Sequence, residues 1–130
     1  RQHAGRATAV ERDLIEALGA RYASPQPEDR RPLDEAYAEA MRTLWWKYPK
    51  DADVGAFFAE SLMNLRPWDQ WTPEGVPQPG TEEVIRVLDA VLALNPDHPF
   101  ANHLYIHAVE ASPHPERALA AADRLRTLQP

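Results

Sequence analysis

The C-terminal stretch PDHPFANHLYIHAVEASPHPERALAAADRLRTLQP, residues 96–130, decides the fold of this chain. It predicts two helices, over about residues 100–111 and 116–128, joined by the turn sequence Ser-Pro-His-Pro. Proline stops a helix, and the two prolines that bound the stretch, Pro96 and Pro130, are 34 positions apart. The stretch therefore predicts a helix-turn-helix unit with a period of 34 residues.

The same 34-residue period also fits the preceding part of the chain if that part contains an insertion. From Pro49 to Pro96 is 47 positions, which is one 34-residue period plus 13. Residues 66–80, the Pro-rich insertion, contain four prolines and two glycines, a composition that predicts a loop and accounts for the surplus. The sequence therefore predicts one helical-repeat domain of three units. Their predicted bounds are about residues 1–50, 51–96 and 97–130.

Four further helices are predicted from apolar residues that recur every three or four positions. They span about residues 7–23, 33–48, 52–65 and 81–94. The apolar stripe of the first consists of Val10, Leu14, Ile15, Leu18 and Tyr22, and that of the third of Val54, Phe57, Phe58, Leu62 and Leu65. Asp51 or Asp53 is expected to cap the third helix, and Thr81 the fourth. No segment alternates with a period of two, so the predicted fold class is all-α, with six main helices.

Small or apolar residues occupy equivalent positions when counted back from each proline. They are Tyr37, Met41 and Leu44 in the first unit, Val84, Leu88 and Val91 in the second, and Ala118, Ala122 and Leu125 in the third. In this pattern and its period the chain resembles the tetratricopeptide-repeat family over nearly its whole length, although the Trp-Leu-Gly-Tyr positions of the family's first helix are not reproduced. The resemblance implies a right-handed α-α superhelix of about three helix pairs. Its first helices would line a concave groove that binds a protein or peptide.

The string NHLYIHAVEAS, residues 102–112, is also similar to one found in bacterial tetratricopeptide-repeat proteins of uncharacterised function. In those relatives we expect another histidine-bearing repeat to follow. Because the chain begins with Arg1 and ends at the helix-closing Pro130, we interpret it as a piece of a longer protein that carries half of a polar site. A repeat array needs polar caps, so uncapped apolar ends are predicted to favour self-association.

One face of the predicted fifth helix carries candidate chemistry. His103, His107 and Glu110 are spaced i, i+4 and i+7, which places them on one side of a helix. Two imidazoles and a carboxylate are ligands for a divalent metal such as zinc, with a fourth ligand from a neighbouring helix or from water. The zinc-protease pattern is absent, because Leu104 stands where it needs glutamate.

Counting within the repeat places further polar residues beside this face. With Pro99 as position 1 of the third unit's first helix, His103, His107 and Glu110 fall at positions 5, 9 and 12. With Ala52 as position 1 in the second unit, Glu60 and Asn64 fall at positions 9 and 13. Such positions face the groove in the family that the chain resembles. The candidate ligand-binding residues are therefore Glu60, Asn64, Asn102, His103, His107 and Glu110. Three roles remain open for them: contact with a protein, peptide or small ligand, a metal site that could be enzymatic, or plain packing.

Aromatic and histidine residues near the turns have alternative roles. Trp45 and Trp46 are adjacent and cannot both face the core, so one is expected to pack against a neighbour and the other to cover a seam. Trp68 and Trp71 either fold over the groove as a lid or partner anchor, or cap the ends of the third and fourth helices. Three histidines in terminal or loop contexts are expected to be solvated: His3, His98 and His114.

Composition limits the partner and leaves the compartment open. Twenty acidic residues outnumber fourteen basic ones, for a net charge of −6, and the basic residues are scattered, so nucleic acid is not an expected partner. No apolar run reaches the ~18 residues of a membrane span. The absence of cysteine excludes disulfides, thiolate zinc sites and cysteine nucleophiles, but it leaves cytoplasm and periplasm equally open.

Overall fold

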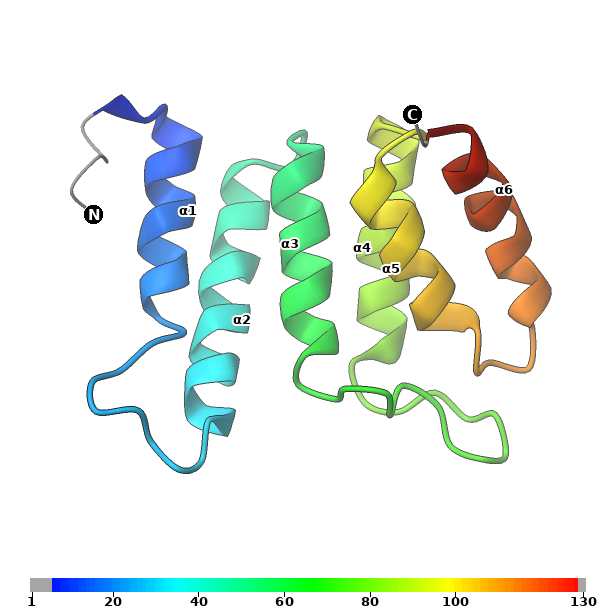
Figure 1. Cartoon of the computed structure of the whole chain (residues 1–130), viewed down its shortest axis with the longest axis horizontal. Coiled ribbons are helices and arrows are strands. Elements are labelled where there is room, and N and C mark those ends of the chain that lie inside the picture. Colours follow the sequence, from blue (N-terminus) through cyan, green and yellow to red (C-terminus); the bar gives the residue numbers. More distant parts are fainter. Residues whose placement is uncertain (1–5, 129–130) are drawn as a thin grey trace.

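The computed structural model describes residues 6–128, which fold into six α-helices (Figure 1). They are α1 (Ala9–Gly19), α2 (Arg31–Lys47), α3 (Ala52–Met63), α4 (Thr81–Leu94), α5 (Pro99–Val109) and α6 (Leu119–Leu128), with a 3₁₀ turn, η2 (Pro115–Ala118), before α6. Within the described residues there is no strand, only an isolated bridge between Trp71 and Pro77. The predicted all-α fold class is confirmed.

The helices stand side by side in chain order. Each α-helix packs against the next, and α3 also contacts α5 directly. Figure 1 shows α1, α2 and α3 in a row, followed by α5 in front of α4, with α6 at the far end. The contact between α3 and α5 skips one helix of the row. None of the described helices is both long enough and apolar enough to cross a membrane.

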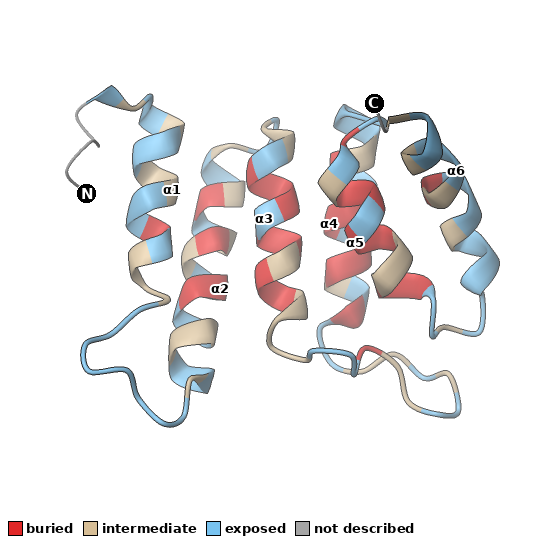
Figure 2. Ribbon diagram, in the orientation of Figure 1, coloured by how far each residue is buried: buried red, intermediate tan, exposed pale blue. Residues whose placement is uncertain are grey.

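The core lies in the four central helices. Figure 2 shows buried residues concentrated on α2, α3, α4 and α5, whereas α1 and α6 bury one residue each, Ala17 and Ala121. The apolar stripe predicted for the first helix is wrong in part, because Ile15, Leu18 and Tyr22 are 37%, 43% and 63% exposed. The physical reason is that α1 stands at the end of the row, where α2 is its main neighbour, and stops at Gly19.

The helices α3 and α4 have different types of N-cap. Asp51 caps α3 by accepting a hydrogen bond from the Val54 N–H at 3.1 Å. Thr81 does not cap α4 as predicted: Gly80 is the N-cap, with a left-handed φ of 97°, and Thr81 is the first helical residue. The buried Thr81 hydroxyl instead donates to the backbone oxygen of Gln70 at 2.6 Å. This hydrogen bond attaches the Pro-rich insertion to the start of α4.

In its first turn α3 lies close to both α2 and α4 at Gly55. A Cβ atom at this position would overlap Val91 Cγ2 of α4 and would lie 2.7 Å from Trp45 Cζ3 of α2. Only glycine therefore lets α3 sit between α2 and α4 at this spacing. Trp45 packs against the core as one of the adjacent tryptophans was expected to, but Trp46 is 76% exposed and covers no seam.

An ion pair links α2 to α4 across α3. The Arg42 guanidinium binds both carboxylate oxygens of Glu83, one of them at 3.0 Å, and lies 5.1 Å from the centre of the Phe58 ring. Hydrogen bonds from Arg42 lower the pKa of the Glu83 carboxyl. Both charged side chains are partly buried, so water screens their attraction less than it would at an open surface.

We expect Gly55→Ala to destabilise the fold. Alanine favours a helix over glycine by about 1 kcal/mol, whereas overpacking a core costs typically about 1–3 kcal/mol. The branched side chain of Val91 is stiff, and the ring of Trp45 is held by its neighbours. The clash should therefore outweigh the gain in helix propensity, with a net loss of about 1 kcal/mol in the free energy of unfolding measured in urea.

A double-mutant cycle with Val91→Ala identifies the cause of that loss. If the new methyl group meets Val91, removal of the valine side chain makes Gly55→Ala less costly in the double variant than in the wild type. Additive effects of the two changes, or a stabilising Gly55→Ala, would contradict the packing described at this position.

We expect Glu83→Gln to lower the free energy of unfolding by about 1 kcal/mol at neutral pH. The pKa of Glu83 is below its ordinary value of 4.5, so its ion pair stabilises the fold above that pH and loses this effect as the pH falls towards the folded-state pKa. The difference between wild type and variant in urea unfolding should therefore shrink below about pH 4.5. A difference that is constant from neutral to acid pH would show that the pair does not act through the Glu83 charge.

Candidate functional site

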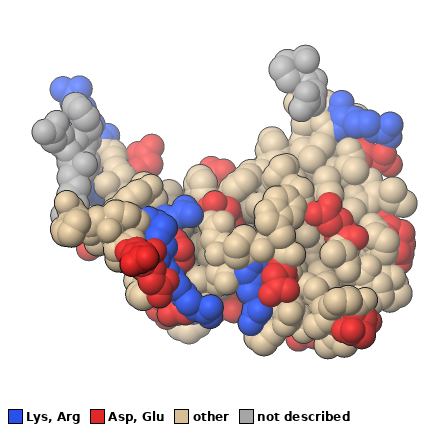
Figure 3. Space-filling view, turned by 60° about the horizontal axis from the view of Figure 1, so that its bottom comes forward, with Lys and Arg blue, Asp and Glu red and all other residues tan. Residues whose placement is uncertain are grey.

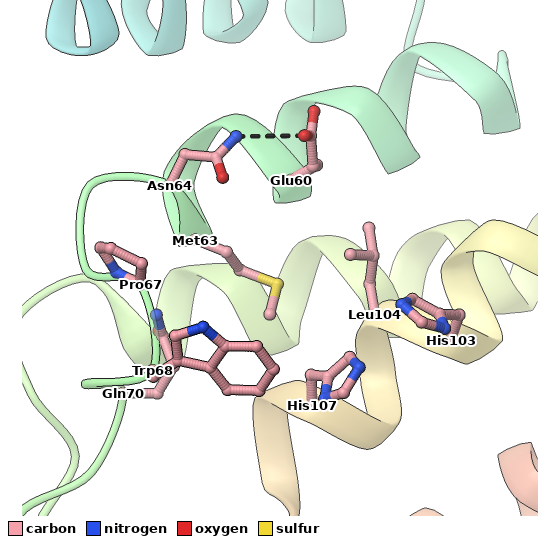
Figure 4. Close-up of a pocket in the computed structure, with 9 residues that line it drawn as sticks. All are labelled: Glu60, Met63, Asn64, Pro67, Trp68, Gln70, His103, Leu104 and His107. Atoms are coloured by element: carbon pink, nitrogen blue, oxygen red, sulfur yellow. Dashed lines mark hydrogen bonds between the residues drawn. The ribbon is translucent and has the colours of Figure 1, made fainter. Parts of the chain in front are cut away.

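A pocket opens between α3 and α5 (Figure 4). Its volume is about 230 Å³, and its lining combines carboxylate, amide, imidazole, indole and apolar groups. The lining residues are Glu60, Met63, Asn64, Pro67, Trp68, Gln70, His103, Leu104 and His107. The C-terminal half of α3 with the residue that follows it, the start of the Pro-rich insertion and the middle of α5 thus form the pocket together.

The α3 wall carries the negative charge of the pocket. Glu60 and Asn64 are one helical turn apart, and Asn64 Nδ2 donates a hydrogen bond to Glu60 Oε1 at 3.1 Å (Figure 4). The pKa of the Tyr37 phenol on α2 is raised, first by burial and then by the negative charge of Glu60. Glu60 therefore lies on a side of α3 that is close to α2 and that also lines the pocket.

The α5 wall presents two imidazole rings. His103 and His107 are one turn apart, and their ring centres are 4.7 Å apart in a T-shaped arrangement. His107 Nδ1 donates to Glu110 Oε1 at 2.8 Å, and Glu110 lies just outside the pocket lining. The structure thus places four of the six candidate residues in the pocket lining: Glu60, Asn64, His103 and His107.

Asn102 does not belong to this site, contrary to the prediction. It is 2% exposed, and its Nδ2 donates to the backbone oxygens of Pro96 and His98, both at 2.9 Å. These hydrogen bonds close the turn before α5, so the role of Asn102 is structural. Successive residues on a helix point about 100° apart, so Asn102 turns inward where His103 faces the pocket.

The geometry does not support the predicted metal site. Among residues 6–128, no group of three or more histidine, aspartate and glutamate side chains is placed to hold a metal ion. His107 and Glu110 are hydrogen-bonded to each other, and the ring of His103 packs against that of His107. These side chains form an aromatic and hydrogen-bonding surface instead of a set of zinc ligands.

The Pro-rich insertion places Trp68 at the edge of the pocket. Trp68 is 85% exposed and has a left-handed φ of 61°, a conformation that costs a non-glycine residue about 1–2 kcal/mol. Its ring is edge-on to that of His107, with centres 5.3 Å apart. This placement fits the lid or anchor alternative for Trp68. Pro67 and Gln70, for which no sequence pattern indicated a role, line the pocket beside it.

Trp71 attaches the insertion to α5. Its Nε1 donates to the backbone oxygen of Ala108 at 2.8 Å. Ala108 is in the last turn of α5, where backbone carbonyls have no partner within the helix. Trp71 therefore satisfies a helix end, as one of the two alternatives expected, but the helix is the fifth and not the third or fourth.

Five rings form a continuous line across α3, α5 and the insertion, here called the aromatic row. Ring-centre distances are 5.9 Å for Phe57–Phe100, 6.5 Å for Phe100–His103, 4.7 Å for His103–His107 and 5.3 Å for His107–Trp68. Phe57 is 40% exposed, although its position in the predicted stripe suggested a core residue. The adjacent Phe58 was the available signal, because neighbouring helical residues cannot both face one core.

His98 is buried, not solvated as predicted. Its Nδ1 accepts a hydrogen bond from the Ala101 N–H at 3.2 Å and thereby caps α5. Nε2 therefore carries the ring proton and donates to Asp53 Oδ1 of α3 at 2.9 Å. His98 thus joins the N-terminal ends of α3 and α5. His114 is exposed as predicted, and His3 lies outside the described residues.

Surface charge is mixed on the face shown in Figure 3. Acidic and basic side chains are interspersed there, and no large area of one sign is visible. Ion pairs such as Lys47–Asp13, at 2.6 Å, place opposite charges side by side. This face therefore lacks the basic stripe that a phosphate backbone requires.

No protein-family model matches this chain, and neither does any curated protein or solved structure. The resemblance to tetratricopeptide repeats therefore stays a prediction. What the chain's own geometry establishes is a stack of six helices with a mixed polar and aromatic pocket between α3 and α5.

We expect Trp68→Gly to be more stable than Trp68→Ala by about 1 kcal/mol, because glycine adopts the left-handed backbone without strain and alanine does not. Trp46, an exposed tryptophan in the last turn of α2 that does not have a positive φ, is the matched control. There the order should reverse, because glycine is worse than alanine in a helix, by up to about 1 kcal/mol. Urea unfolding of the four variants tests both signs, and the same order at both positions would contradict the backbone conformation of Trp68.

Proposed function

We propose that this protein is a helical-repeat scaffold that binds a protein or peptide partner along the aromatic row, with one partner side chain in the pocket between α3 and α5. The observation that carries the proposal is the row itself. Its five rings run from a half-exposed Phe57 to a largely exposed Trp68 and border a cavity that has a carboxylate in its wall.

The size of the pocket favours a side chain over a whole small molecule. Ligand pockets that enclose a drug-sized compound have volumes of about 300–1,000 Å³. The pocket between α3 and α5 has about 230 Å³. A single long side chain fits such a volume, while the rest of the partner can lie on the rings outside it.

The chemistry of the row is that of a protein interface. Large aromatic side chains with few rotatable bonds supply contact area at a low entropic cost, and tryptophan is enriched among residues that dominate binding energy. Glu60 and Asn64 add polar groups that fix the orientation of a bound segment. The proposal agrees with the tetratricopeptide resemblance, in which the first helices of successive units, here α3 and α5, line the groove.

A library of random dodecapeptides displayed on phage tests this proposal. We expect selection on the wild-type protein to enrich peptides whose affinity falls at least about tenfold on Trp68→Gly and on His107→Ala, measured by fluorescence anisotropy. Trp46→Ala removes an exposed tryptophan outside the row and should leave binding unchanged. No enrichment, or peptides that bind all four proteins equally, would contradict a peptide site on the aromatic row.

A further inference from the structure

We propose that the pocket binds the guanidinium group of an arginine side chain presented by the partner. This inference rests on the proposed function, because it names what the same pocket recognises. It follows from three properties of the lining: the sign of its charge, the flat rings along one side, and the apolar groups between them.

The charge of the lining selects a cation. Glu60 is the only carboxylate among the nine lining residues, and none of the nine is lysine or arginine. Arg66, the cation next to the pocket along the chain, is paired with Asp69 at 3.1 Å. Asn64 uses its amide nitrogen to donate to Glu60, which leaves its amide oxygen as a further acceptor. The Glu60 carboxylate and the Asn64 amide oxygen repel a bound anion and attract a cation.

The flat rings select guanidinium over ammonium. Guanidinium is planar, weakly hydrated and able to bind a carboxylate through two parallel hydrogen bonds while stacking on aromatic faces. Trp68, His103 and His107 supply such rings at the rim of the pocket, and the faces of Trp68 are open because the residue is 85% exposed. A lysine ammonium is a compact, strongly hydrated charge and gains less from stacking.

The remaining lining suits the stem of an arginine side chain. Met63 extends from α3 into the space between the two helices, opposite Leu104 (Figure 4). Apolar groups of this kind pack against methylene groups, as protein surfaces do along long charged side chains. The volume of about 230 Å³ leaves room for one such side chain.

The test uses three small probes that share one backbone: the N-acetyl amides of arginine, lysine and citrulline. Citrulline has nearly the shape of arginine but no charge. Each is titrated into ¹⁵N-labelled protein at about pH 8, where imidazoles are ordinarily neutral. We expect the arginine probe to shift the Trp68 indole resonance together with the amides of Glu60 and His107, with saturation. The citrulline and lysine probes should bind at least about tenfold more weakly.

Two matched variants locate the charge. Glu60→Gln keeps the size of the side chain and should reduce arginine affinity at least about tenfold. Glu82→Gln makes the same change in net charge at an exposed position of α4 that does not line the pocket, and should leave the affinity unchanged. Equal effects of the two variants would mean that the whole-protein charge, and not Glu60, attracts the probe, and would overturn the proposal.

Failure of this inference is distinguishable from failure of the proposed function. If the selected peptides bind through the aromatic row, but the arginine probe binds no better than citrulline, the arginine inference is overturned and the peptide scaffold stands. If the arginine probe binds through Glu60 but no peptide is selected, the cation pocket stands and the peptide scaffold is overturned. If the lysine probe equals arginine, the pocket recognises positive charge without the planar group proposed here, and the arginine inference is overturned.

Discussion

The absence of a side chain at Gly55 is the constraint on which the rest of the structure depends. It lets the buried Val91 of α4 and Trp45 of α2 close on α3 from one side. Counted around a helix at about 100° per residue, Phe57, Glu60 and Asn64 lie on the opposite side from Gly55. The contact that fixes α3 between its neighbours therefore leaves its polar and aromatic side chains on the face that borders the pocket.

The second wall of the pocket is held at both of its ends. At the N-terminal end of α5, His98 caps the helix and donates to Asp53 of α3. At the C-terminal end, the Trp71 indole donates to a carbonyl of the last turn, and the same insertion carries Trp68 to the pocket. Because α5 is attached at both ends, the position of this wall follows from the fold itself. For the proposed partner, binding would then not include the entropic cost of ordering α5.

The insertion is therefore more than a surplus in the repeat. Pro67, Trp68 and Gln70 of the insertion form one side of the pocket, and Trp68 is the last ring of the aromatic row. The left-handed backbone of Trp68 lies in a loop that hydrogen bonds attach on either side, from Trp71 to α5 and from Thr81 to Gln70. The position of the insertion therefore determines which side chains line the pocket.

Features that depend on a single helix could be predicted from the sequence alone. The recurrence of apolar residues predicted six helices, and the i, i+4 spacing put His103 and His107 on one face, because both depend only on the geometry of a single helix. Only the tertiary structure decided that Asn102 and His98 are buried, since a polar side chain can turn inward wherever other segments offer it partners. It also decided that Leu18 of α1, the first helix in the row of helices, is exposed. The position of the tryptophans in the insertion likewise depends on contacts with other helices. Such contacts join residues that are far apart in the chain, and a periodic pattern in the sequence cannot predict them.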